Sequence, residues 1–155
     1  MRSRTSNWFE CKVRYEKVME NGTEKKVTEQ YVVDALSFSE AEKRITEQMS
    51  AYISGEFEIT DVKKAQYKVV FFDDAEMSDR YYKAKLAFIT IDEKTEKEKR
   101  SNVTYLVQAA TLDGAVTHIN EVMDGTMIDY EKSNIAETKI MDVFEYKKQE
   151  EHEGE

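Results

Sequence analysis

The chain has 155 residues, of which 40% are hydrophobic and 11% aromatic, which is enough for one core but not for several independent domains. The formal net charge of −9 disfavours unspecific attraction to nucleic acid. The single cysteine, Cys11, excludes an intrachain disulfide and a cysteine-rich metal site, and no apolar run is long enough for a membrane helix or a secretory signal. These properties predict a soluble, cytoplasmic protein.

The first predicted element is a strand that begins at Trp8, because apolar and polar residues alternate from that point. Its inner face carries Phe9, Cys11, Val13 and Tyr15. The pair Asn21-Gly22 favours a tight hairpin turn, since both residues tolerate a positive φ angle. A second alternating strand follows, with Val27, Tyr31, Val33 and Ala35 on its expected inner face.

A helix is predicted to begin after Ser37, which is a typical N-cap residue with Glu40 placed to complete a capping box. Apolar residues then recur at helical spacing and predict a stripe that packs on the sheet: Phe38, Ala41, Ile45, Met49 and Tyr52. The helix is expected to stop at Ser54-Gly55. Residues 57–72 then predict an extended segment with an irregularity near Asp61.

The second half of the chain repeats the first. Residues 24–49, aligned with residues 98–123, are identical at nine of 26 positions, whereas chance would give about one or two. The second copy accordingly predicts strands at 81–91, 101–110 and 134–146, and a helix at 112–123. We interpret this pattern as an internal duplication.

The expected fold is therefore α+β, with an internally duplicated β-β-α-β unit that forms antiparallel sheet and carries two helices packed on it. A helical crossover of this length can return the third strand beside the first, antiparallel to it, and duplication predicts pseudo-twofold symmetry. We expect one domain over residues 1–146, made of repeats 8–72 and 81–146 with a joint at 73–80. The acidic tail 147–155 has nothing apolar to bury and is expected to be disordered.

No catalytic, cofactor or metal motif is recognisable. His118 lies on the surface of the second predicted helix and His152 in the tail, while Cys11 faces the predicted core. The acidic joint Asp73–Arg80 lacks the glycine and closing glutamate of a calcium loop. We therefore expect no enzyme, no cofactor and no metal site.

One arrangement predicts a binding surface, on the outer face of the two first strands and their neighbours. It combines aromatic, basic and apolar residues: Trp8, Lys12, Arg14, Val32, Tyr81, Lys83, Lys85 and Leu106. Aromatic rings interleaved with cations can stack bases and hold phosphates. The same residue types are also enriched at subunit contacts, and acidic residues such as Glu10 share the face. A plain solvated sheet is the third interpretation of these residues.

Several runs also carry a resemblance to a known family: RTSNWFECKVRYEK, KKVTEQYVVDALSFSEAE, ITIDEKTEKEKRSNVTYLVQA and ETKIMDVFE. Over Ser3 to Glu145 the chain resembles a family of short proteins from gut bacteria and their phages, which is known as a domain of unknown function numbered four-four-nine-four. The resemblance implies a bacterial or phage protein of the cytoplasm. It implies no activity, cofactor or catalytic residue.

The function expected from these observations is a non-enzymatic binding or protein-interaction module that self-associates through an exposed sheet face. Its partner would be another protein or a second copy of the chain, with no membrane involved. The alternative is a single-stranded nucleic-acid-binding protein that uses the same face. A third hypothesis is capture of a small molecule between the two copies.

Overall fold

The computed structural model describes residues 1–146, so the predicted tail at 147–155 lies outside the described residues. Its contacts divide the chain into two compact units. Among the described residues, the five-stranded unit contains Met1–Thr5 and Gln66–Lys139, and the four-stranded unit contains Ser6–Ala65 and residues 140–146. These boundaries differ from the expected repeats, because each unit takes its strands from both halves of the chain.

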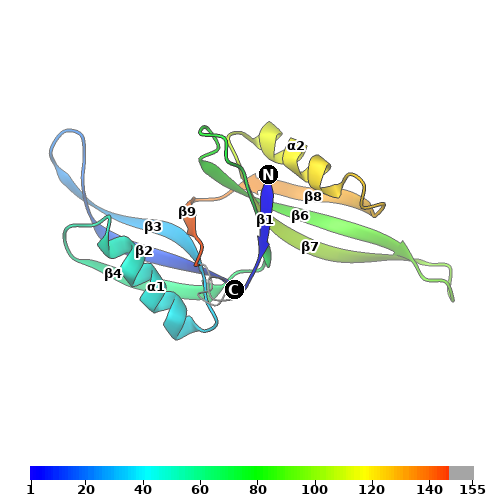
Figure 1. Ribbon diagram of the computed structural model, residues 1–155, viewed down its shortest axis with the longest axis horizontal. Coiled ribbons are helices and arrows are strands. Elements are labelled where there is room, and N and C mark those ends of the chain that lie inside the picture. The colour runs from blue at the N-terminus through cyan, green and yellow to red at the C-terminus, as the bar shows by residue number, and fades with distance from the viewer. Residues whose placement is uncertain (147–155) are drawn as a thin grey trace, which may run out of the picture. The chain divides into compact units, whose positions relative to one another are not determined.

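The four-stranded unit consists of one sheet and one helix, and Figure 1 shows the helix lying along the sheet. The strand order is β4-β2-β3-β9. The elements are β2 (Trp8–Val18), β3 (Glu24–Asp34), α1 (Phe38–Ser50), β4 (Phe57–Lys64) and β9 (Ile140–Phe144).

Helix α1 begins as its sequence predicts. The Ser37 side chain accepts a hydrogen bond from the Glu40 backbone N–H at 3.1 Å, and the Glu40 carboxylate accepts one from the Leu36 N–H at 2.8 Å. The apolar stripe of the helix packs on one sheet face and closes the core of this unit. The buried core residues are Phe9, Cys11, Val13, Val33, Ala35, Ala41, Ile45 and Met49.

The five-stranded unit has the same plan with one additional strand. Its order is β1-β5-β7-β6-β8, and α2 lies over the sheet in Figure 1. The elements are β1 (Arg2–Thr5), β5 (Val69–Phe72), β6 (Arg80–Ile91), β7 (Glu98–Ala109), α2 (Leu112–Met123) and β8 (Asp129–Glu137).

The α+β prediction is confirmed, and in each unit the strand that follows the helix returns beside the first strand of the preceding hairpin, as predicted. β4 pairs antiparallel with β2, and β8 pairs antiparallel with β6. Both pairs contain a bulge, with Thr60 as the extra residue in β4 and Ser133 as the extra residue in β8. The irregularity predicted near Asp61 is the first of these bulges.

The predictions of one strand at 57–72 and of one strand at 134–146 are both wrong, and the structure differs from them in the same way. Each breaks into two strands, and the second one joins the sheet of the other unit: β5 pairs parallel with β7, and β9 pairs parallel with β3. The two added strands lie in corresponding registers, since Phe71 is opposite Val107 and Phe144 is opposite Val33. Each sheet is thus completed by a strand from the other half of the chain.

Three residues that were expected to face inward are exposed instead: Phe38, Tyr52 and Leu112. Phe38 and Leu112 are the first residues of their helices, so their side chains lie at the rim of the sheet where contact with the core ends. No helix in residues 1–146 is long and apolar enough to cross a membrane.

Candidate functional site

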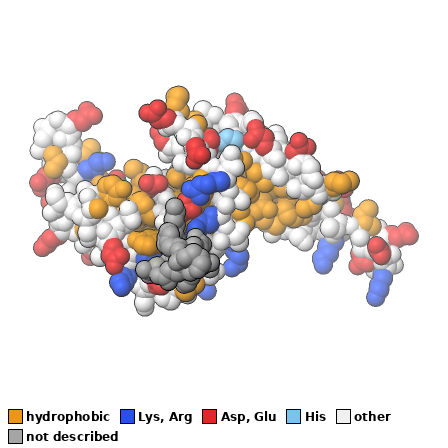
Figure 2. Space-filling view, in the orientation of Figure 1, with side chains coloured by type: hydrophobic (Ala, Val, Ile, Leu, Met, Phe, Trp, Pro, Cys, Tyr) orange, Lys and Arg blue, Asp and Glu red, His pale blue; other side chains and the backbone are white. Residues whose placement is uncertain are grey.

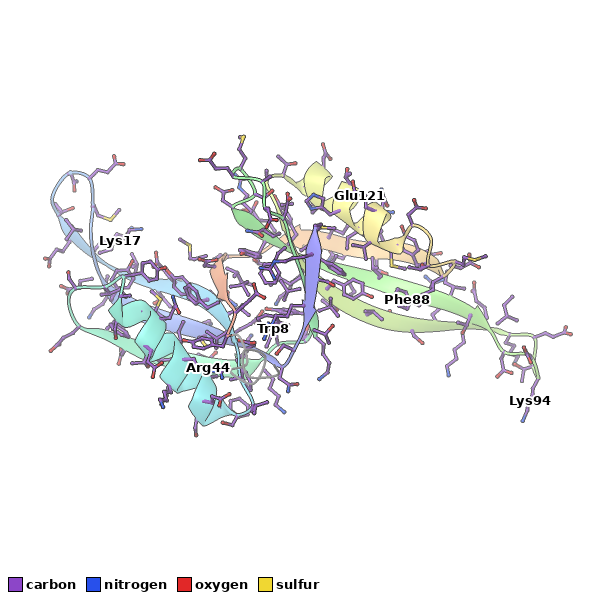
Figure 3. All side chains as sticks on the ribbon, in the orientation of Figure 1. Trp8, Lys17, Arg44, Phe88, Lys94 and Glu121 are labelled. Atoms are coloured by element: carbon purple, nitrogen blue, oxygen red, sulfur yellow. The ribbon has the colours of Figure 1, made fainter. Side chains whose placement is uncertain are left out.

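The apolar members of the predicted binding face are buried, which corrects the expectation that this face is exposed. Trp8 is 2% exposed and Tyr81 3% exposed, while Val32 and Leu106 are inaccessible to solvent. Figure 3 labels Trp8, and its strand, β2, belongs to the four-stranded unit. A ring buried to this degree cannot stack on a nucleic-acid base from outside.

The physical reason for this burial includes the exchanged strands. Val143 of β9 lies opposite Val32, and Val70 of β5 lies opposite Leu106. Val70 and Val143 are themselves buried, so each exchanged strand extends an apolar surface on the sheet face that carries no helix. The alternating pattern of β2 and β6 did not indicate this burial, because charged residues occupy the remaining positions of the same face.

The basic members of the predicted face are distributed over two units. Lys12 and Arg14 belong to the four-stranded unit, and Lys83 and Lys85 to the five-stranded unit. Arg14 pairs with Glu58 at 3.9 Å between Nη1 and Oε1, and the Lys83 ammonium lies 5.8 Å from the centre of a tyrosine ring. Figure 2 likewise shows acidic side chains beside basic ones on the face that it draws. The described arrangement therefore gives little support to a continuous basic groove.

A different surface emerges at the outer edge of the four-stranded sheet, where β4 has a neighbouring strand on one side only within residues 1–146. Ile59 and Val62 lie half-buried on the α1 side of this strand and pack against the core there. Glu58 and Lys63 lie on the opposite side, where they pair with Arg14 and Glu10 of β2. The bulge at Thr60 accounts for this arrangement, because it places positions three apart on the same face.

A depression of about 260 Å³ lies along the α1 side of this edge. Its lining is Phe38, Ser39, Glu42, Ile59, Asp61 and Val62. The Phe38 ring packs edge-on against Phe9 at 5.2 Å between centroids, and about half of its surface is exposed. The edge of β4 therefore combines unpaired backbone groups with accessible apolar side chains, which is the usual composition of a strand-addition site.

The other long edge strand, β8, has a different character. It carries Asp129, Glu131, Lys132 and Glu137. Glu137 pairs with Arg80 of the adjacent strand β6, and Glu131 pairs with Arg100 of β7. β4 carries as many charged residues, but two are acidic and two are basic, whereas three of the four on β8 are acidic. Two β8 edges would therefore bring like charges together. Among the two long edges, β4 is the better suited to an additional strand.

The acidic joint forms a structured cluster. Asp73 accepts a hydrogen bond from the Ser78 hydroxyl at 2.5 Å, and its carboxylate lies 3.6 Å from His118 Nε2. The Gln108 side chain accepts from the Asp73 N–H at 2.9 Å and donates to the Ser78 carbonyl at 2.9 Å. The side chains of Asp73, Ser78, His118 and Gln108 thus hold the loop before β6 against β7 and α2.

Although it contains serine, aspartate and histidine, this cluster lacks the order of a nucleophilic triad, because the carboxylate lies between the hydroxyl and the imidazole. The Ser78 hydrogen bond lowers the pKa of Asp73 below its ordinary value, which makes this carboxylate a weak base. Ser78 is also buried. The geometry favours a structural role.

Replacing Asp73 by asparagine is expected to destabilise the protein by about 1–2 kcal/mol at neutral pH, through the loss of charge-assisted hydrogen bonds. Because the folded-state pKa of Asp73 lies below the unfolded value, the carboxylate stabilises the fold above pH 3.8, the ordinary value, and this contribution falls as the pH drops toward the folded-state pKa. Urea unfolding at several pH values should show that the difference in the free energy of unfolding between the parent and Asp73→Asn becomes smaller in acid. The exposed neighbour provides the control, Asp74→Asn, which should show neither effect.

Cys11 lies in the core, as its position on the inner strand face predicts, and is inaccessible to solvent. Burial raises the pKa of its thiol to about 12, so the thiol is protonated at neutral pH. Among residues 1–146 no three histidine, cysteine or acidic side chains converge as metal ligands would.

Two larger depressions, of about 630 and 600 Å³, lie at the ends of the sheets. The first lies where the chain passes from α2 to β8, and the second lies where it enters β4. In the first, the Asn120 side-chain oxygen already accepts hydrogen bonds from the Tyr130 hydroxyl and the Lys132 ammonium. In the second, the Arg14 guanidinium pairs with Glu58. In both depressions, these polar side chains bind one another.

The sequence prediction missed the β4 edge. The signal was present in the run FEITDVKK, in which a negative residue near the start and positive residues near the end flank apolar ones. We interpreted that run as the beginning of a longer extended segment, 57–72, and did not assign it to an edge of the sheet.

Comparison with known proteins gives one match. The family model described as a domain of unknown function (DUF4494) matches residues 7–146. No curated protein and no solved structure matches the chain.

Proposed function

This chain belongs to the DUF4494 family, and we propose from its own geometry that it is a non-enzymatic protein-interaction module that self-associates through a sheet edge. The observation that carries the proposal is the edge of β4, an eight-residue strand with no outer neighbour in the described part of the chain. Unpaired backbone donors and acceptors on such a strand form a template for another strand. The surface proposed is therefore an edge and not the sheet face.

The chemistry of the edge supports this proposal. Ile59 and Val62 are half-buried, so a partner strand that covers them removes apolar surface from water. The outer face of the strand carries both signs of charge, in Glu58 and Lys63. A single pair of strands buries a modest area, and we therefore expect a weak, reversible association in the micromolar range.

The nucleic-acid alternative has weaker support. Lys12 and Lys85 are exposed, but the rings that would stack on bases, those of Trp8 and Tyr81, are buried. A basic surface without a stacking platform would hold phosphates through charge alone, and the net charge of −9 opposes that.

Sedimentation of the purified chain over a wide concentration range tests the proposal. We expect the mean mass to rise from that of a monomer of 18.1 kDa toward that of a dimer as the concentration increases. A monomer at every concentration would contradict self-association. In parallel, the anisotropy of a labelled single-stranded oligonucleotide should stay constant, whereas saturable binding that salt reverses would favour the nucleic-acid alternative.

A further inference from the structure

We infer that β4 pairs antiparallel with β4 of a second copy, in the register that sets Glu58 opposite Lys63. This inference rests on the proposed self-association and specifies the contact. Antiparallel pairing of one strand with its own copy generates a twofold axis, which is the symmetry of the commonest dimers. In this register the axis passes between Thr60 and Asp61.

The first argument is the match of side chains along the strand. Glu58 of each copy faces Lys63 of the other, so two pairs of opposite charge form in every dimer. Ile59 faces Val62 in the same register, which gives two apolar pairs. A shift of one residue would instead place Ile59 opposite Lys63 or Asp61 and would lose both kinds of pair.

The second argument is that residues placed opposite each other lie on the same face of the sheet. Ile59 and Val62 both contact the core beneath α1, while Glu58 and Lys63 both project from the other face, where they pair with β2. Opposed residues of two antiparallel strands must share a face, and this register satisfies the requirement on both faces. It also places the bulges at Thr60 of the two copies next to each other at the axis, so neither interrupts a regular part of the other strand.

The third argument is that the depression beside the strand can accommodate the partner. Ile59 and Val62 are part of its lining, together with the half-exposed Phe38. Val62 of the second copy would lie beside Ile59 at the rim of this depression, which removes apolar surface of both from water.

The corresponding edge of the other unit provides an internal comparison. When β8 is paired with itself about its own bulge at Ser133 in the equivalent register, Glu131 faces Ala136 and Lys132 faces Ile135. Neither of these is a pair of opposite charges or an apolar pair. Self-complementarity about the bulge is therefore a property of β4 and not of both edges.

A charge exchange tests the register. Glu58→Lys sets two lysines opposite each other at both ends of the contact, and Lys63→Glu sets two glutamates opposite each other at the same places. Each variant alone is therefore expected to dimerise about ten-fold more weakly than the parent. When a Glu58→Lys chain pairs with a Lys63→Glu chain, lysine faces glutamate at both ends of the contact. In an equimolar mixture, the heterodimer is therefore expected to have a higher affinity than either homodimer. The matched control is Lys25→Glu, which makes the same charge change on β3, a strand that does not border β4, and should leave dimerisation unchanged.

A cysteine pair provides a second test that does not depend on charge. In the inferred register, Glu58→Cys of one chain and Lys63→Cys of another lie within about 5 Å between Cβ atoms, close enough for a disulfide after small adjustments. Two Glu58→Cys chains would hold their thiols about 17 Å apart, at about 3.4 Å per residue. Oxidation of the mixture should therefore give a covalent dimer that neither variant gives alone. The native Cys11 is buried with a raised pKa and should not compete.

The outcomes separate the inference from the proposed function. Cross-linking only in the mixture, with rescue of dimerisation in the charge exchange, supports the inferred register. A chain that dimerises in sedimentation but gives no preferential cross-link or rescue overturns the register and leaves self-association in place. A chain that remains monomeric at every concentration overturns both.

Discussion

Removal of residues 140–155 is expected to unfold the four-stranded unit, whereas removal of residues 147–155 alone should leave its stability nearly unchanged. The longer truncation deletes β9, which closes the sheet beside β3. Ile140 and Val143 are buried in this strand, and the Phe144 ring stacks on Tyr31 at 5.6 Å. Burial of one such side chain contributes about 1.5–3 kcal/mol, against a total stability of about 5–15 kcal/mol for a domain.

The contacts of the last described residue make the two truncations a sharp comparison. The Tyr146 N–H donates to the Asp34 carboxylate at 2.9 Å, and its hydroxyl donates to the Arg44 carbonyl at 3.0 Å. Truncation after Tyr146 retains both bonds and all of β9. Truncation after Lys139 loses them and leaves the backbone of β3 without its parallel neighbour.

Trp8 reports the result, because it is 2% exposed and belongs to the four-stranded unit. In the chain that ends at Lys139, its emission should be red-shifted before any denaturant is added, and no cooperative urea transition should remain for this unit. The chain that ends at Tyr146 should unfold at the parental midpoint. Parental midpoints for both truncations would show that β9 is dispensable and that the sheet is complete without it.

Replacement of Arg44 by alanine is expected to lower the free energy of unfolding by about 2–4 kcal/mol, because it leaves the buried Asp34 carboxylate without its guanidinium partner. Arg44, which Figure 3 labels on α1, donates from Nη1 to the Asp34 carbonyl at 2.6 Å and lies 3.8 Å from the Asp34 carboxylate. The same guanidinium lies 4.4 Å from the centre of the Tyr146 ring and pairs with Glu40 at 3.4 Å. One side chain thus joins the end of β3, the first turns of α1 and the C-terminal segment.

The control for this substitution is Arg14→Ala. The Arg14 and Glu58 side chains are 45% and 66% exposed, so their pairing is screened by water and should contribute less than about 1 kcal/mol. Urea unfolding of both variants measures the difference directly. If both substitutions lowered the free energy of unfolding equally, the burial of Asp34 would not explain the stabilisation by Arg44.

The local elements were predictable because their signals are local. Alternation specified the paired strands that became β2, β3, β6 and β7, Asn21-Gly22 specified the first hairpin, and Ser37 specified the start of α1. The run VVFF of β5 has no alternation, because both of its faces are largely buried, and the run RSRT of β1 has no apolar residue at all. Periodicity therefore could not separate β5 from β4 or find β1.

The candidate site was less predictable. Trp8, Lys12 and Arg14 do alternate on one strand face, as predicted, but exposure depends on what lies beside that face. Val70 and Val143 lie beside Leu106 and Val32 only because their strands cross into the other unit. The repeated dipeptide Val70-Phe71 and Val143-Phe144 was the available signal that these segments correspond, yet it does not reveal the sheet to which each belongs.

The sequence by itself determined the α+β class, the two helices, the N-cap of the first helix, and the antiparallel return of the third strand beside the first. These features depend on side-chain periodicity and turn chemistry, which act over a few residues. Only the tertiary structure decided the exchange of β5 and β9, the burial of Trp8 and Tyr81, and the free edge of β4. Strand partnership is decided by which apolar surfaces cover each other across the whole chain, and no local pattern contains that information.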